Sequence, residues 1–270
     1  MDFEEHRSHL RSVAYRMLGS LAEADDAVQE AWLKLERADP TDIANPRGWL
    51  TTVVARVCLD MLRSRKSRRE DIGPIPERAG AIDPETELQL ANSVGLALLV
   101  VLEMLDPAER LAFVLHDLFA VPFDEIAAIV GRSPDATRQL ASRARRRVQG
   151  AEPPPADIAK QRIVVDAFLT AARGGDFNAL VAVLDPDVTI RLDSPHPIEL
   201  RGADVVARRT IKGGARAAQP ALIDGHVGVI IAPRGRLTMV LQLTFVGDKI
   251  VAIDAVGDPA RLAQLDLAVL

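Results

Sequence analysis

The sequence is poor in residues on which many catalytic and extracellular proteins depend. It holds one cysteine, Cys58, in 270 residues, so it can form neither an intramolecular disulfide nor a zinc site built from several thiolates. Aromatic residues make up only 4% of the chain and include a single tyrosine, Tyr15. The sequence also lacks a phosphate-binding glycine loop, a metal-ligand spacing and a nucleophile elbow. We therefore expect neither a cofactor nor a metal.

Long hydrophobic runs are absent as well. The longest, VGLALLVVLEML at 94–105, is interrupted by Glu103 and is far shorter than the roughly 20 apolar residues that span a bilayer. The first ten residues, MDFEEHRSHL, are acidic and polar, unlike a signal peptide. The formal net charge is −5. We expect a soluble, intracellular protein in a reducing compartment, with no membrane contact.

The length predicts two domains or three small ones. Apolar residues recur at helical spacing through most of the first 150 positions. Two stretches break the pattern: EDIGPIPERAGAIDP at 70–84 and the triple proline in AEPPPAD at 151–157. We predict five segments: a helical domain (1–70), a linker (71–84), a second helical domain (85–150), a proline-rich spacer (151–156) and a C-terminal domain (157–270).

The C-terminal domain has a different pattern. A helical segment starts near Asp157, a shorter one follows Asp176, and VTIRLD then alternates apolar and polar residues. Two apolar segments, RLTMVLQLTF and KIVAIDAV, flank VGD, which is typical of a hairpin. These features predict an α+β domain with a helical start and a curved antiparallel sheet.

The segment 131–150, GRSPDATRQLASRARRRVQG, concentrates six arginines beside a single acid in an acidic chain. Ser133 suits a helix N-cap and Pro134 suits the first helical position. The residues that follow separate onto two faces of a helix. One face holds Thr137, Leu140, Ala141, Ala144 and Val148, and the other holds Asp135, Arg138, Gln139, Ser142, Arg143 and Arg146.

A short apolar helix within 121–130 and a turn at Gly131 precede this segment. Together they form the helix-turn-helix pattern, in which the second helix enters the major groove of DNA. Arginine and glutamine can pair there with guanine and adenine edges. The alternative is a solvated helix whose arginines only keep the chain soluble. The agreement of turn, cap and amphipathic pattern favours DNA binding.

Two further features concern the first helical domain. A second basic cluster, RSRKSRR at 63–69, ends a long helix that carries Asn45 and Trp49 at its start. Basic side chains can bind phosphates and an aromatic ring can stack on an unpaired base, although Trp49 could instead be a core residue beside a frayed helix end. The segment 23–35 is acidic on one side and apolar on the other. It either packs internally or faces a basic protein.

Three segments, 24–35, 45–69 and 105–148, together resemble bacterial RNA polymerase sigma factors of the extracytoplasmic-function (ECF) group. The match extends in the right order over nearly all of residues 1–150. The resemblance implies an alternative sigma factor whose partners are core RNA polymerase and promoter DNA, and it is compatible with an anti-sigma factor. In that family the first helical domain binds the polymerase clamp and melts the −10 promoter element. The second binds the −35 element through a helix-turn-helix.

The resemblance also implies roles for individual residues. The polymerase-binding helix carries Asp25, Asp26, Gln29, Glu30, Trp32 and Leu33. The residues expected at the −10 element are Asn45 and Trp49, with Arg63, Arg65 and Lys66 at the basic end of the adjoining helix. The residues expected at the −35 element are Arg138, Gln139, Ser142, Arg143 and Arg146.

Residues 157–270 resemble the cone-shaped SnoaL-like domain that some ECF factors carry at the C-terminus. The expected fold class is therefore multidomain: two all-α sigma-type domains, the second with a helix-turn-helix, followed by an α+β SnoaL-like domain. Relatives have a glycine-rich loop after the first strand, whereas this chain has DSPHPIEL at 193–200.

Asp193 and His196 of that loop are candidates for a regulatory contact with the sigma core. The alternative is that this domain is a small-molecule isomerase or cyclase, or a ligand sensor, in which the same two residues form an acid/base pair. Isomerases of this fold commonly use a tyrosine to bind an oxyanion, and residues 157–270 contain none. The absence favours a regulatory domain, and we expect no enzyme activity.

Overall fold

The computed structural model describes residues 3–37, 45–72, 95–149, 156–193, 198–213, 215 and 217–270. Their contacts divide the chain into two compact units. The first comprises Met1–Val94 and Leu102–Arg146, and the second comprises Gly95–Val101 and Arg147–Leu270. The predicted linker from residue 73 onward and residues 151–155 of the predicted spacer lie outside the described residues.

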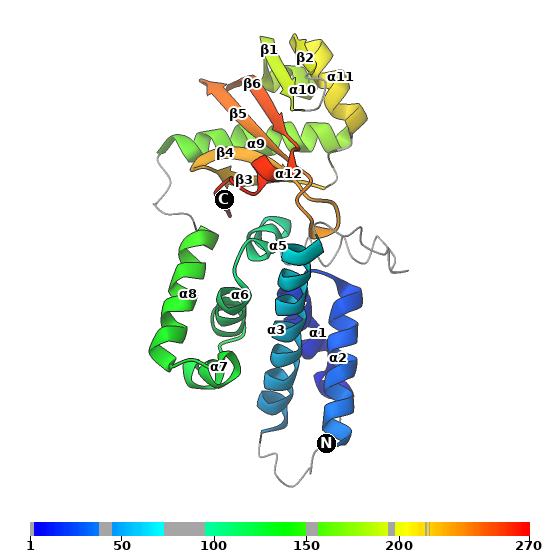
Figure 1. The fold of residues 1–270 in the computed structure, drawn as a ribbon. Helices are drawn as coiled ribbons and strands as arrows, with labels where there is room; N and C mark the ends of the chain where they lie inside the picture. The colour runs from blue at the N-terminus through cyan, green and yellow to red at the C-terminus, as the bar shows by residue number, and fades with distance from the viewer. Residues whose placement is uncertain are drawn as a thin grey trace. The chain divides into compact units, whose positions relative to one another are not determined.

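The first unit is helical (Figure 1). Its helices are α1 (Glu4–Leu18), α2 (Leu21–Glu36), α3 (Pro46–Ile72), α6 (Pro107–Phe113), the π-helical turn η2 (Val114–Leu118), α7 (Phe123–Val130) and α8 (Pro134–Gln149), whose last residues belong to the second unit. Helices α1, α2 and α3 pack on one another. The apolar stripe predicted on α1 is buried there, at Leu10, Val13, Ala14, Met17 and Leu18.

The second unit is built on one seven-stranded sheet of order β2-β1-β6-β5-β4-β3-β7. Its strands are β1 (Leu184–Leu192), β2 (Ile198–Arg201), β3 (Ala218–Ile223), β4 (His226–Ile231), β5 (Met239–Val246), β6 (Lys249–Val256) and β7 (Leu267–Ala268). Its helices are α5 (Leu96–Glu103, up to Val101), α9 (Ala156–Gly174), α10 (Phe177–Val183), α11 (Ala203–Gly213), the short η3 (Pro233–Gly235) and α12 (Pro259–Leu262).

Helix α9 packs against β3 and β4, and α10 and α11 pack against β1, which gives the sheet a helical layer. The core under these helices contains Val165, Phe168, Val229, Leu243 and Ile253, all buried. The α+β class predicted for this part of the chain is confirmed, and so is the β5–β6 hairpin, which turns at Gly247 with φ 61°.

The predicted antiparallel sheet contains one parallel pair. Strand β1 pairs with β6 in parallel, with Ile190 opposite Ile253. Some sixty residues separate these two positions in the sequence, so their pairing follows from the closure of the whole sheet. A local turn leaves a signal in the sequence, whereas this long-range pairing does not.

Candidate functional site

The helix-turn-helix forms as its sequence predicts. Helix α7 ends at Val130, and Gly131 follows in the left-handed conformation with φ 73° and ψ 40°. Its backbone N–H donates to Ala127 O at 2.9 Å, so the glycine closes the helix and turns the chain. Ser133 then caps α8, because its Oγ accepts from the N–H of Ala136 at 3.2 Å. Figure 1 shows α7 and α8 as two green helices joined by this short turn.

Helix α8 presents one buried and one exposed face. All five residues predicted to face the core are buried, from Thr137 and Ala144 at 0% exposure to Val148 at 7%. The residues predicted on the other face are exposed: Asp135, Arg138, Gln139, Ser142, Arg143 and Arg146. This face has the polar and cationic character that base edges and phosphates require.

Two arginines of α8 have acidic partners that lie outside the helix. Arg143 Nε donates to Glu109 Oε1 of α6 at 2.8 Å, and the Glu109 side chain is only 11% exposed. Arg145 donates twice to Asp117 Oδ1, at 2.6 and 2.8 Å. The arginines are therefore balanced by more than the single acid in their own segment.

Arg138 is held from the N-terminal side of α8. It forms an ion pair with Asp135, one turn earlier, and its guanidinium lies 5.6 Å from the centre of the Phe123 ring. Both contacts are exposed and of low energetic value. They orient the side chain while leaving the guanidinium at the surface.

The exposed face of α2 is acidic and has an apolar end. Asp25, Asp26, Gln29 and Glu30 are exposed, and Trp32 and Leu33 expose 39% and 41% of their surface. Phe3 of the first unit supports Trp32 through an edge-on ring contact at 4.9 Å. Exposed aromatic surface next to charged residues is typical of a protein–protein interface.

The start of α3 is fixed by a cap. Asn45 Oδ1 accepts from the N–H of Gly48 at 3.1 Å. A Cβ at position 48 would lie 2.6 Å from Asn45 Nδ2, so a larger residue there would displace the capping side chain. Trp49, one residue further, is half-buried. The two residues expected at the −10 element thus lie on the first turn of one helix.

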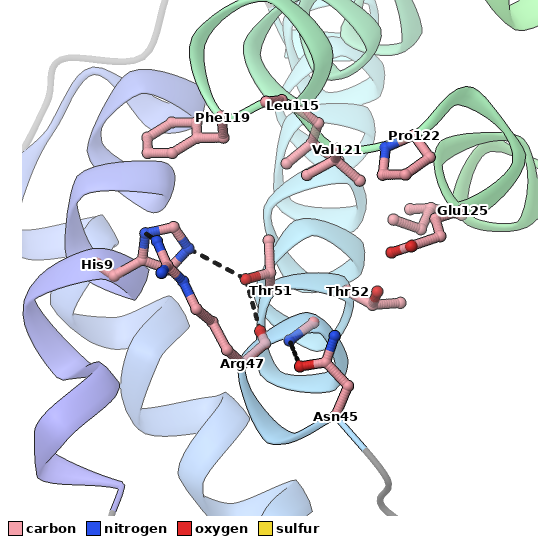
Figure 2. Close-up of a pocket in the computed structure, with 13 residues that line it drawn as sticks. His9, Asn45, Arg47, Thr51, Thr52, Leu115, Phe119, Val121, Pro122 and Glu125 are labelled. Carbon is pink, nitrogen blue, oxygen red and sulfur yellow. Dashed lines mark hydrogen bonds between the residues drawn. The ribbon is translucent and has the colours of Figure 1, made fainter.

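A cavity of about 330 Å³ opens beside this turn (Figure 2). His9 of α1, Asn45 and Arg47 line one side, and Phe119 and Glu125 are among the residues on the other. An arginine cannot accept a hydrogen bond. Arg47 Nη2, 3.3 Å from His9 Nδ1, must therefore donate to it.

A chain of hydrogen bonds follows from this assignment. His9 Nε2 carries the proton and donates to Thr51 Oγ1 at 3.2 Å. Thr51 in turn donates to Arg47 O at 2.7 Å. Burial, followed by the charge of Arg47, lowers the pKa of His9 below its usual value, which favours the neutral ring that the chain requires.

The basic end of α3 divides into inward and outward residues. Arg65 is half-buried, forms an ion pair with Glu23 and donates to Leu18 O at 3.3 Å. Lys66 pairs with Asp106 at 2.7 Å. Arg63 is exposed, 4.0 Å from Asp60. Of the three cations predicted here, Arg63 and Lys66 are exposed, and Arg63 has the longer of their two ion pairs.

Comparison with known proteins decides the family. Residues 3–68 match the model for Sigma-70 region 2 and residues 95–148 match that for Sigma-70 region 4. The chain is 43% identical over 255 residues to ECF RNA polymerase sigma factor SigJ of Mycobacterium tuberculosis, covering 86% of this chain and 80% of SigJ. This chain is an ECF RNA polymerase sigma factor.

A second relative agrees with the assignment. This sigma factor is 36% identical over 272 residues to the probable ECF sigma factor SigI of M. tuberculosis, which covers 96% of this chain and 93% of SigI. The crystal structure of M. tuberculosis SigJ matches over 96% of both chains with 36% identity and a TM-score of 0.48. The family resemblance inferred from the three sequence segments is confirmed.

Sequence reasoning missed a buried residue that links regions 2 and 4 of this sigma factor. Arg110 of α6 is 3% exposed, and its Nε and Nη2 donate to Arg16 O at 3.2 and 3.1 Å. Arg16 lies in the last turn of α1, whose carbonyl groups have no partner within the helix. Burial lowers the pKa of Arg110 to about 10, so it remains cationic at neutral pH and complements the helix dipole.

Two residues of the C-terminal domain, Asp193 and His196, were predicted to make a regulatory contact. Asp193 follows β1 directly, and its carboxylate accepts from Arg261 Nη1 at 2.6 Å. His196 lies outside the described residues.

Within the ranges that the structure describes, no three acidic, cysteine or histidine side chains form a metal-binding cluster. Among the described helices, none has both the length and the apolar character needed to cross a bilayer.

Proposed function

We propose that this sigma factor binds core RNA polymerase through the outer face of α2, reads the −35 element with α8 and opens the −10 element with the start of α3. The observation that carries the proposal is the outer face of α8. Arg138, Gln139 and Arg143 are exposed there, directly after the turn that aims the helix. The protein would act in the cytoplasm, where RNA polymerase transcribes the genome.

The acidic face of α2 supports the polymerase contact. Asp25 and Glu30 already have basic neighbours on their own unit, Arg11 at 3.1 Å and Lys34 at 3.5 Å. These pairs are exposed and weak, so basic residues of a partner can replace them. Trp32 and Leu33 supply the apolar centre that a stable contact needs.

The packing of α3 on α6 and α7 has a consequence for promoter binding. By their numbering, the −10 and −35 elements lie about 25 base pairs apart, or roughly 85 Å at about 3.4 Å per step. With α3 packed on α6 and α7, the start of α3 and the adjoining α8 cannot span that distance. We propose that polymerase binding separates region 2 from region 4, breaking the Arg110–Arg16 and Lys66–Asp106 contacts.

We further propose that the C-terminal domain regulates initiation and catalyses no reaction. The contact between Asp193 and Arg261 supports this, because the guanidinium occupies a carboxylate oxygen that an acid/base catalyst would have to present to its substrate. A domain tethered to regions 2 and 4 has a high effective concentration, so a weak contact with them suffices.

Run-off transcription tests the proposal. Purified protein and core polymerase on a pool of genomic promoters should give promoter-specific transcripts that core polymerase alone does not give. A protein truncated after Gly150 should then give a clearly different yield over a range of core concentrations. Absence of specific transcripts would refute the sigma assignment, and identical curves for the two proteins would refute regulation by the C-terminal domain.

A further inference from the structure

The boundary of region 4 differs between sequence and structure. The family model for region 4 covers residues 95–148, but Gly95–Val101 belongs by its contacts to the same unit as Arg147–Leu270. The first seven residues of the region 4 match therefore group with the C-terminal domain, whereas Leu102 and Glu103 at the end of α5 group with the first unit.

The residues of α5 explain why this helix needs cover on every side. Its sequence is LALLVVLE, and Leu96, Leu99, Val100 and Val101 are each at most 3% exposed. Consecutive helical residues point about 100° apart, so Leu99, Val100 and Val101 face three directions. A helix that is apolar all round is stable only when it is buried on all sides.

The sheet offers a matching surface. Ile230 of β4 lies directly opposite Val240 of β5, which lies directly opposite Val256 of β6. Residues paired in this way point to the same face of the sheet. These three are 1%, 0% and 2% exposed, so they form a buried apolar row across three strands.

The row lies on the face opposite the long helices. Val229 and Leu243 belong to the core under α9, α10 and α11, and side chains alternate along each strand, so Ile230 and Val240 point away from that core. The single turn of α12 follows β6 closely and contributes Leu262, which is also buried. One turn is too short to cover a row that crosses three strands.

We propose that Gly95–Val101 docks on the face of the sheet formed by Ile230, Val240 and Val256. The C-terminal domain thereby holds the first helix of region 4. The docking is a property of the fold, but its regulatory meaning rests on the function proposed above. Whatever loosens this apolar contact frees α5 to move with the helix-turn-helix, and whatever tightens it restrains region 4.

Amide hydrogen exchange on the full-length protein tests the docking. The variant V240A/V256A removes buried methyl groups from the row while keeping both strands. We expect the amides of 96–101 to exchange about tenfold faster than in the parent protein, because local opening is easier when packing is lost. The matched control is L241A, which truncates the neighbouring side chain on the opposite face. It should leave 96–101 within about twofold of the parent.

Three results would overturn the proposal. They are unchanged exchange in 96–101 of folded V240A/V256A, an equal increase in L241A, or an increase confined to 259–270, which would make the C-terminal segment the occupant. If the double variant does not fold, V240T keeps the shape of the side chain and places a hydroxyl under α5, with the same expected result. Run-off transcription of the same variants separates the two proposals. If the variants initiate normally and the exchange of 96–101 is unchanged, the sigma function stands and the docking proposal is refuted.

Discussion

Helices α2 and α8 are built alike and carry opposite charge. Each has 16 residues and begins after a serine cap, Ser20 or Ser133. Each packs alanine-rich faces inward. The outer face of α2 is acidic and ends in exposed Trp32 and Leu33, whereas that of α8 is basic and polar. The scaffold decides which face is outside, and the residues on that face decide the class of partner.

The comparison predicts that the charge of α2 determines binding to core polymerase and has no effect on binding to DNA. D26K/E30K should weaken core binding by roughly 100-fold or more, because like charges at an interface cost several kcal/mol. Binding of the same protein to −35 DNA should not change. Pull-down with core polymerase measures the first effect, and circular dichroism confirms the fold.

The matched control is E5K/D248K, which changes the net charge equally at two exposed positions outside α2. It should bind core polymerase nearly as the parent does. Equal loss in both double variants would show that net charge, and not the α2 surface, governs the contact.

The second prediction divides the arginines of α8 into those that contact a base and those that bind phosphates. Arg138→Ala should cost about 1–3 kcal/mol at one base position of the −35 element. Arg147→Ala, near the end of the helix, should weaken binding to all sequences alike and lower the salt slope by about 1. Binding to single-base promoter variants at several salt concentrations measures both. An Arg138→Ala protein with unaltered base preference would show that Arg138 does not contact a base.

The third prediction concerns the partner of Arg143. Glu109 lies 2.8 Å from the Arg143 Nε and is mostly buried, so it should fix the direction in which Arg143 points. Glu109→Gln should weaken base preference by about 1 kcal/mol, which is part of the loss expected for Arg143→Ala. Normal discrimination in Glu109→Gln would show that Arg143 reaches DNA without this support.

The smallest expected effect is on acid stability. The pKa of His9 is lowered by burial and then by Arg47 and His6, so its stabilising contribution is complete above about pH 6.5, its ordinary value. That contribution is lost as the pH falls through the lower folded value, when the ring becomes charged and repels Arg47. Denaturant midpoints from pH 5 to 8 should fall on the acid side, and His9→Gln should flatten that fall. Parallel curves for both proteins would contradict the assignment.

The sequence predicted the local features well because they repeat at short range. Every buried and exposed position assigned to α8 is confirmed, since a 3.6-residue period determines them. The turn at Gly131 and the β5–β6 hairpin are also confirmed, because each depends on a glycine within a few residues of the elements that it joins.

Long-range partners left no comparable signal. The acids that pair with Arg143 and Arg145 lie 34 and 28 residues away, and the Arg65–Glu23 pair spans 42. Arg110 looks like any surface arginine in the sequence. The parallel β1–β6 pairing and the docking of α5 are likewise set by the assembled fold. The roles of the residues assigned to polymerase and DNA remain predictions.

The burial of Cys58 has a practical consequence for following the motion of this protein. It is the sole cysteine of the chain, and burial raises its pKa to about 12. At pH 8 only about one molecule in ten thousand carries the reactive thiolate. A cysteine introduced on the surface of α2 and another on α8 could therefore be coupled to fluorophores without replacing the native thiol. Energy transfer between them would then report the separation of the two helices as polymerase binds.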